Sequence, residues 1–302
     1  MKIATTLSQL YVVYNLSPAE AVKTAARSGF RYIDYSFYDC FTYNRDYLAD
    51  DDSLWKKEVE AAAAAAEKYG MKYVQAHTPN YNPAKDCDHE ICMRAVRRSI
   101  EACGMLGIPN AVLHTSYSRQ HLYPADREAY FEYNRKFICE LLPIAEKNNV
   151  TLCIENSSFG NMQGMYFFMT AAEMNEFIAY MDHPLIGACW DTGHALMEGK
   201  SDQYKDLLEL GANLKAVHIH DNNGRDSHLA PYCGKLQLDS IVRGLKDVSF
   251  KGYFTFEADN FLSRTNGSGV LSCLPLDIHI DGLAILYKIG KNALEKYDCF
   301  EE

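Results

Sequence analysis

The sequence predicts a (β/α)8 barrel, and three observations support that fold. Short apolar runs alternate with helical segments eight times along the chain, which is the pattern of a parallel sheet with helical connections. Glycine recurs where a helix gives way to a strand, as at Gly70, Gly107 and Gly211. Eight such units in 302 residues suit a closed barrel better than an open sheet. Since no linker rich in Pro, Ser or Gly interrupts them, we expect a single domain over residues 1–302.

The first half of the chain is expected to supply four strands and four helices. Ser17-Pro18-Ala19-Glu20 forms a capping box, with Ser as N-cap, Pro at the first helical position and Glu three residues after Ser. Pro143 lies inside the fourth helix and should bend it, because proline has no backbone N–H to donate. The expected strands are 2–8, 30–36, 71–77 and 108–114, and the expected helices are 17–29, 55–69, 87–106 and 126–148.

The second half repeats this alternation. Thr170-Ala171-Ala172-Glu173 is a second capping box that should start a helix. The expected strands are 150–156, 184–191, 213–221 and 252–258, and the expected helices are 170–181, 203–210, 238–248 and 278–297. Two long connecting segments, 39–52 and 260–275, are expected to act as lids or as contacts of a homo-oligomer.

Composition narrows the classes of protein to consider. With 48% hydrophobic and 23% charged residues the chain has an ordinary globular composition. A net charge of −10 and the absence of a Lys/Arg block argue against a nucleic acid partner. No secretory signal is evident, and no apolar stretch is long enough to span a membrane. The ten cysteines are scattered without a C-x-x-C spacing, so we expect a cytoplasmic protein with free thiols.

Four apolar strands in succession end on an ionisable residue: Glu155, Asp191, His218 and Glu257. One such ending is unremarkable, since a carboxylate at a strand end can cap a helix or face solvent. Four are unusual because burying unpaired charge is costly. The carboxyl ends of all strands in a parallel barrel meet at one mouth. Two Glu, one Asp and one His that converge there predict a site for one divalent cation, with Mn²⁺, Mg²⁺, Co²⁺ and Zn²⁺ all compatible.

These strand ends also carry a resemblance to a known family. The segments "CIEN", "WDTGHA", "VHIHDN", "DSHLAPYCGKLQLD" and "FTFEAD" resemble the xylose-isomerase-like barrel superfamily. That superfamily includes sugar isomerases and epimerases, and also the metal-dependent apurinic-site endonucleases. The resemblance extends over nearly the whole chain and is strongest between residues 150 and 260. It therefore implies the same barrel and a metal site, but not one substrate.

The sugar branch of this superfamily implies a set of roles for these residues. Glu155 and Glu257 would bind the metal and act as the acid and base, with Asp191 and His218 completing the coordination. The substrate would be a small ketose, inosose or related keto-sugar. Its reaction would be proton transfer next to a carbonyl, through a metal-stabilised enediolate. The candidates for contacts with the substrate are His77, His114, His194 and Arg225.

The nuclease branch implies additional metal ligands, and this chain has a residue for each of them. The possible extra ligands, for up to three Zn²⁺, are His77, His114, His194, Asp226 and His228. The chain could therefore be an apurinic-site phosphodiesterase, although its negative charge favours the sugar branch. Tyr232-Cys233-Gly234 also stands where the sugar branch has P-G-x-G. A keto-sugar dehydratase or lyase, and a binding protein without turnover, remain open as alternatives.

Two residues next to the predicted metal ligands are expected to face away from the site. Strand alternation turns His220 to the face opposite His218, where it should pack against a helix. By the same rule Trp190 should point away from the barrel interior, because it directly precedes Asp191. Packing in the core is therefore expected for both residues.

Overall fold

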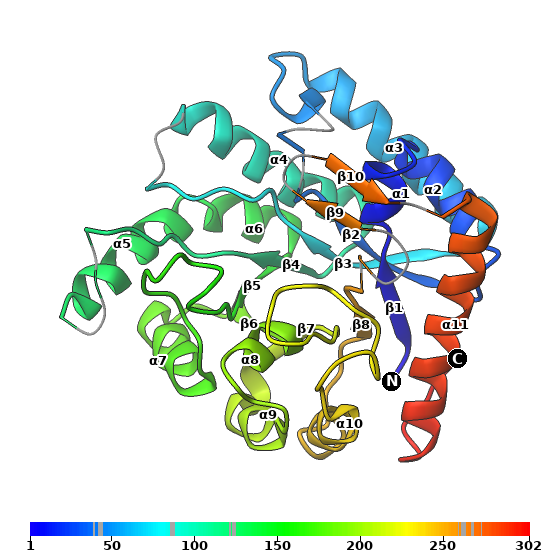
Figure 1. The fold of residues 1–302 in the computed structure, drawn as a ribbon. Helices are drawn as coiled ribbons and strands as arrows, with labels where there is room; N and C mark the ends of the chain where they lie inside the picture. Colours follow the sequence, from blue (N-terminus) through cyan, green and yellow to red (C-terminus); the bar gives the residue numbers. More distant parts are fainter. Residues whose placement is uncertain are drawn as a thin grey trace.

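The computed structural model describes residues 1–38, 40–41, 45–84, 88–120, 122, 125–258, 260, 264–266, 269–272 and 274–302. Eight parallel strands form one sheet in the order β7-β6-β5-β4-β3-β2-β1-β8 (Figure 1). The strands are β1 Ile3–Thr6, β2 Tyr32–Ser36, β3 Lys72–His77, β4 Asn110–Leu113, β5 Thr151–Glu155, β6 Ile186–Asp191, β7 Leu214–His218 and β8 Phe254–Phe256. The predicted fold class is therefore confirmed.

The two ends of this sheet meet just beyond β7. Ile219 pairs with Phe256 in a parallel bridge. The Ile219 N–H donates to the Thr255 carbonyl at 2.8 Å, and the Glu257 N–H donates to the Ile219 carbonyl at 3.1 Å. These bonds close the barrel at its carboxyl end, directly beside the last two strand-end residues of the predicted cluster.

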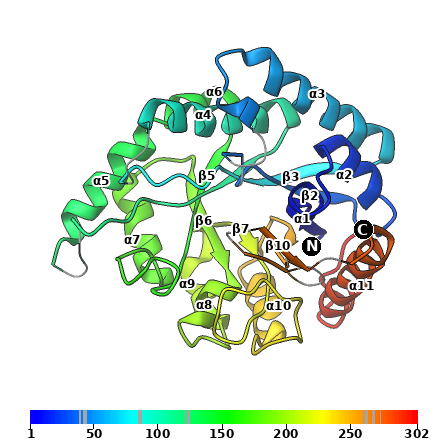
Figure 2. The same ribbon diagram turned by 45° about the horizontal axis from the view of Figure 1, so that its top comes forward.

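The helices surround the strands, as the turned view in Figure 2 shows. Both predicted capping boxes are confirmed, at Ser17 with Glu20 and at Thr170 with Glu173. The α-helices are α1 Ser8–Val12, α2 Pro18–Ala25, α3 Asp52–Tyr69, α4 His89–Leu106, α5 Arg127–Cys139, α6 Leu142–Asn148, α7 Ala171–Met181, α8 Thr192–Met197, α9 Tyr204–Leu210, α10 Leu238–Asp247 and α11 Leu276–Glu295. Short 3-10 turns occur at Arg45–Tyr47 and Gly211–Asn213.

The helix predicted over residues 126–148 was wrong in one respect, because it is two helices. α5 ends at Cys139, and α6 begins at Leu142 with Pro143 in its first turn. A proline ring clashes with the carbonyl four residues earlier, which here is that of Cys139. α5 therefore ends at Cys139. Pro143 lies in the first turn of α6, where the backbone N–H groups have no partner within the helix and a proline is tolerated. Two short helices, α1 and α8, were not predicted at all.

Small side chains fill the barrel interior beneath the strand ends. Val112, Cys153, Cys189 and Ala216, one from each of β4 to β7, form a buried cluster of their own. Burial raises the pKa of the Cys153 thiol to about 12, so this side chain acts as a neutral filler. Trp190 is fully buried, which agrees with its predicted packing in the core. Its indole N–H donates to Gln203 Oε1 at 2.8 Å, so the buried N–H has a hydrogen-bond partner.

The two long connecting segments are described only in part. Asp39 and residues 42–44 lie outside the described residues, as do 259, 261–263, 267–268 and 273. Within the second segment, β9 Arg264–Asn266 pairs antiparallel with β10 Gly269–Ser272. The role of either segment as a lid or an oligomer contact stays a prediction.

The two chain ends lie side by side, where α11 runs next to β1 (Figure 1). The amino group of Met1 forms an ion pair with Glu301 at 2.9 Å. Among the helices of the described part of the chain, none has both the length and the apolar character needed to cross a membrane.

The capping box at the start of α7 yields a test of the fold. Replacing Thr170 by Ala removes the hydroxyl that accepts the Glu173 N–H, and should lower the free energy of unfolding by about 1 kcal/mol in urea denaturation. Thr24→Ala is the matched control, because Thr24 lies inside α2 and caps no helix. Equal losses in both variants would contradict a specific capping contribution.

Candidate metal centre

The four predicted strand-end residues come together at the carboxyl end of the barrel. They lie on consecutive strands, with Glu155 ending β5, Asp191 ending β6, His218 ending β7 and Glu257 directly after β8. One ligand atom from each side chain lies within 4.8 Å of those of the other three. The side chains of Glu155, Asp191 and His218 are at most 1% exposed, and that of Glu257 is 15% exposed.

His218 lies at the middle of this cluster. Its Nδ1 is 2.5 Å from Glu155 Oε1 and 3.3 Å from Glu257 Oε2. Burial disfavours ionisation of Glu155, but His218, His114 and His77 together hold its pKa well below the usual range. Glu155 is therefore a carboxylate at neutral pH even though it is almost completely buried.

Glu257 has a different environment from Glu155. Burial raises the pKa of the Glu257 carboxyl to about 7, and the nearby carboxylates of Glu155 and Asp191 add to that rise. His218 and His228 partly offset it. The two glutamates of the cluster thus differ in their readiness to carry a proton, because three histidines stabilise the Glu155 carboxylate while burial dominates at Glu257.

The donor set fits a divalent cation. In the described part of the chain, every ion pair of Glu155, Asp191 and Glu257 is with a histidine. Three buried carboxylates repel one another unless positive charge lies among them. Carboxylate oxygens together with an imidazole nitrogen are ligands for Mn²⁺, Mg²⁺, Co²⁺ or Zn²⁺. A cation bound among them would remove the repulsion.

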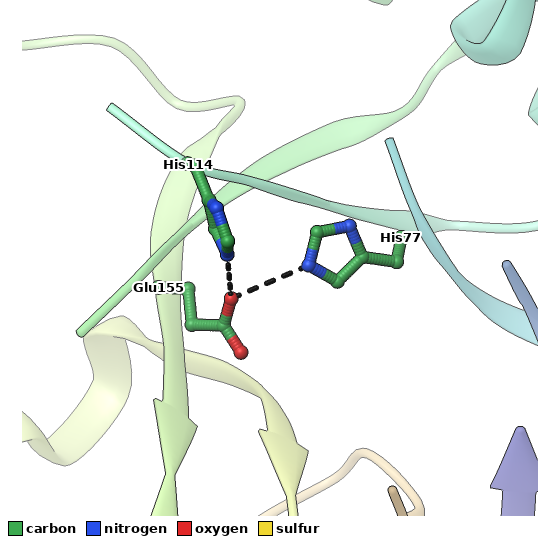
Figure 3. Close-up of side chains that lie close together, drawn as sticks. All are labelled: His77, His114 and Glu155. Carbon is green, nitrogen blue, oxygen red and sulfur yellow. Dashed lines mark hydrogen bonds and ion pairs between the residues drawn. The ribbon is translucent and has the colours of Figure 1, made fainter. Parts of the chain in front are cut away.

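The two histidines predicted on β3 and after β4 contact the same glutamate, as Figure 3 shows. His114 Nε2 is 2.6 Å from Glu155 Oε2, and His77 Nε2 is 3.4 Å from the same oxygen. The Nδ1 of His77 is 2.8 Å from the Thr78 carbonyl, which orients the ring. His77, His114 and Glu155 form a second group that could hold a metal ion, and it shares Glu155 with the first.

Asp191 has two structural roles besides its place in the cluster. It is the N-cap of α8, because its Oδ1 accepts the His194 N–H at 2.6 Å. The side chain of Asn156 clamps the Asp191 backbone, accepting from its N–H at 2.6 Å and donating to its carbonyl at 3.0 Å. His194 is held through Nδ1 by the Asn156 carbonyl at 2.9 Å, and its Nε2 is 3.4 Å from Asp226 Oδ2.

The expectation that His220 faces away from the site was wrong. Its Nε2 is 3.0 Å from Asp191 Oδ2, and its ring stacks on that of His228 at 4.2 Å. His220 lies two residues beyond the end of β7, and its side chain reaches across to Asp191 at the end of the neighbouring β6. The ring also packs against the first turn of α8 at Gly193, so the expected helix contact does exist.

Asp226 and His228 extend the site on the loop after β7. His228 Nε2 is 3.1 Å from Asp226 Oδ1, and its Nδ1 is 2.9 Å from the Glu257 carbonyl. Burial opposes ionisation of Asp226, yet His228 and His194 hold its pKa well below the usual range. His220, Asp226 and His228 form a further group that could hold a metal ion.

The remaining predicted residue, Arg225, stands apart from the cluster. Its side chain is exposed and forms no ion pair with another described residue. The same loop continues to Gly234, whose N–H donates to Asp221 Oδ2 at 2.9 Å. A Cβ on Gly234 would collide with the Asn222 carbonyl. The segment Tyr232-Cys233-Gly234 differs from the P-G-x-G of the sugar branch, but its glycine is still required by this close contact.

Three site residues were missed in the sequence: Asp34, Asn156 and His220. Asp34 is buried on β2, and its Oδ2 accepts a hydrogen bond from Nε2 of His218 at 3.2 Å. A carboxylate inside the apolar run "YIDYS" was the available signal for it. For Asn156 and His220 nothing in the spacing indicated a role, because their contacts join loops that follow different strands.

Comparison with known proteins identifies a family whose sequence model covers most of the chain. The sequence model of a family described as "Xylose isomerase-like TIM barrel" matches residues 22–270. The uncharacterized protein MJ1311 of Methanocaldococcus jannaschii is 24% identical over 224 residues, which are 72% of this chain and 75% of that protein.

Two solved structures share the fold over nearly their whole length. D-psicose 3-epimerase, solved in the presence of D-fructose, has a TM-score of 0.74 and 17% identity over 97% of this chain and 99% of that one. The IOLI protein, solved with a zinc atom, has a TM-score of 0.73 and 16% identity over 100% of each chain. At these identities the likeness establishes the fold alone.

Gly193 yields a test of the packing around His220. A Cβ at this position would overlap the nearest atoms of the His220 ring, which is a severe steric clash. The ring cannot easily move aside, because it hydrogen-bonds Asp191 and stacks on His228. Gly193→Ala should therefore lower the free energy of unfolding by about 1–3 kcal/mol in urea denaturation. Gly160→Ala is the control, since its Cβ would meet only Met197 at an ordinary 3.5 Å. A Gly193→Ala protein as stable as the control would contradict this packing.

Proposed function

The chain belongs to the xylose isomerase-like TIM-barrel family, and from this premise we propose that it is a divalent-metal-dependent isomerase or epimerase of a small keto-sugar. The observation that carries the proposal is the convergence of Glu155 and Glu257 from two sides of one buried cluster. Between them on neighbouring strands lie Asp191 and His218. D-psicose 3-epimerase has the same fold, and this supports a sugar as the class of substrate.

In this proposal the cation is held by Glu155, Asp191, His218 and Glu257. Their ligand atoms already lie within 4.8 Å of one another, so little rearrangement is needed to surround an ion. When bound, the cation supplies Lewis acidity that polarises a substrate carbonyl and acidifies the neighbouring C–H. The zinc atom in the IOLI structure supports a divalent ion in such a barrel, and the identity of the metal here is left open.

The two glutamates would exchange the substrate proton. Glu257 is the more accessible, at 15% exposed against 1% for Glu155, so its carboxylate is the better placed to take a proton from the carbon next to the carbonyl. The C–H electron pair moves towards the carbonyl carbon, and the carbonyl oxygen gains the charge. Return of a proton from a water, or of one relayed through Glu155 from the histidines bonded to it, then gives the isomer or epimer.

Other side chains at the mouth would bind and orient the sugar. His194 lies one helical turn beyond Asp191. Burial lowers its pKa, but Asp191 and Asp226 outweigh this and raise the pKa to about 10, so the protonated ring can donate to a substrate oxygen through Nε2. Tyr38 packs its ring edge-on against His77 and His114, at centroid distances of 5.0 and 5.9 Å. An aromatic side chain in this place would limit access of water and offer an apolar face to the sugar.

A multi-metal phosphodiesterase is the second candidate, and a specific observation favours it. The groups His77–His114–Glu155 and His220–Asp226–His228 lie on either side of the four-residue cluster, and each could hold an ion. Several adjacent cations would suit cleavage of a phosphodiester. A dehydratase or lyase acting on a keto-sugar would begin with the same proton removal as the isomerase, so product analysis separates those two.

Metal analysis tests the proposal and its rival together. Purified protein dialysed against metal-free buffer and reloaded should retain about one Mn, Co, Mg or Zn per chain by elemental analysis. About three Zn per chain would favour the phosphodiesterase and call for an assay of abasic-site cleavage. A protein that retains no metal after reloading would contradict the metal centre itself.

Glu257→Gln tests the two-glutamate mechanism. The amide cannot accept the substrate proton, so exchange of the α-hydrogen of a ketose into deuterated water should fall by at least about 100-fold. Proton exchange can be followed by NMR over a panel of ketoses. Glu128→Gln is the control, because Glu128 is exposed on α5. Exchange at the wild-type rate in Glu257→Gln would eliminate the proposed role of Glu257.

A further inference from the structure

We infer that Asp34 is a positioning residue that orients His218 for the cation. The inference rests on the proposed metal centre and adds a residue from the opposite side of the barrel. Asp34 lies on β2, 184 positions from His218 on β7, and its Oδ2 is 3.2 Å from His218 Nε2. The other ring nitrogen, Nδ1, faces Glu155 and Glu257. The ring therefore bridges Asp34 on one side and the cluster on the other.

The orientation of His218 is the reverse of that of three neighbouring histidines. His77, His194 and His228 each place Nδ1 on a backbone carbonyl, at 2.8 to 2.9 Å, and direct Nε2 towards a carboxylate of the site. His218 directs Nδ1 towards the site, and its Nε2 is met by a side chain instead. Its geometry thus depends on the identity of residue 34, while that of the other three depends on the backbone.

The chemistry of imidazole explains why this contact matters. A neutral ring carries one proton, and only the nitrogen without it can bind a metal ion. A carboxylate accepts hydrogen bonds and cannot donate one, so Asp34 holds the proton of His218 on Nε2. In the metal-free protein Nδ1 also carries a proton, which it donates to Glu155 at 2.5 Å. Once that second proton is lost, Nδ1 would present its lone pair to a cation, while Asp34 keeps the remaining proton on Nε2. Carboxylate partners of metal-binding histidines act in this way by fixing the tautomer and the ring orientation.

Packing alone does not account for a carboxylate at this position. Asp34 is 2% exposed, and its Oδ1 has no hydrogen-bond partner. An unpaired buried polar atom of this kind costs about 1–3 kcal/mol. Oδ2 is fixed from a second side, because Gln75 Nε2 donates to it at 2.9 Å. The side chain is therefore held rigidly with one oxygen aimed at His218, at a cost in stability that a neutral apolar residue would avoid.

The test uses two substitutions and Zn²⁺ alone as the probe. Asp34→Ala removes the acceptor, and Asp34→Asn keeps the shape and one acceptor oxygen but loses the charge. Titration of Zn²⁺ against a competing chelator dye should show an affinity about 10–100-fold weaker in Asp34→Ala, with Asp34→Asn between it and the wild type. Val112→Ala is the matched control, since it lies in the barrel interior and makes no polar contact with His218. Its affinity should stay near that of the wild type.

NMR of the His218 ring separates positioning from a general structural effect. In the wild type the Nε2 proton should appear downfield, as a proton hydrogen-bonded to a carboxylate does, and His218→Gln would assign it. In Asp34→Ala this resonance should move upfield or vanish, while in Val112→Ala it should persist. Wild-type Zn²⁺ affinity together with an unshifted Nε2 proton in Asp34→Ala would overturn the inference.

The same spectra distinguish failure of the inference from failure of the proposed function. If the wild type did not bind Zn²⁺, the proposed metal centre would be contradicted. The contact between Asp34 and His218 would still be tested, because the Nε2 proton can be observed in the metal-free protein. An Nε2 resonance that does not depend on residue 34 would then overturn the positioning role as well.

Discussion

The structure depends on one electrostatic constraint, which is the burial of three carboxylates whose oxygens lie within 4.8 Å of one another. Glu155, Asp191 and Glu257 meet in a space where water is almost excluded. Such a group is unstable unless positive charge lies among its members. Histidines surround it and pair with all three carboxylates, and a divalent cation is the other source of positive charge that these ligands suit. The positions of nearly all the polar residues at the barrel mouth follow from this requirement.

Backbone carbonyls orient some of the side chains around these carboxylates, and other side chains orient the rest. Loop and strand-end carbonyls orient His77, His194 and His228, so those rings follow from the path of the chain. Asn156 clamps the end of β6, and Asp191 in turn caps the helix that carries His194. His218 alone among these histidines is held from below, by Asp34 inside the barrel. His77 is thus held by the residue next to it, whereas Asp191 and His218 are held by partners on other elements.

The errors of the sequence interpretation share a physical origin. Periodicity identified all eight strands, because each is a short apolar run between glycine or capping signals. It failed at Pro143, where a steric clash with one carbonyl outweighed the helical pattern. It also failed at His220, because alternation predicts the face of a strand and not which neighbouring strand end a long side chain reaches.

The sequence by itself determined the fold class, the family and the four strand-end residues of the cluster, since these follow from local patterns repeated along the chain. Only the tertiary structure decided how they meet. The contact of Asp34 with His218 joins residues 184 positions apart, and the stacking of His220 on His228 joins the chain just after β7 to the loop that follows it. Such contacts arise from the closure of the barrel, which brings opposite strands together at distances that no local pattern encodes.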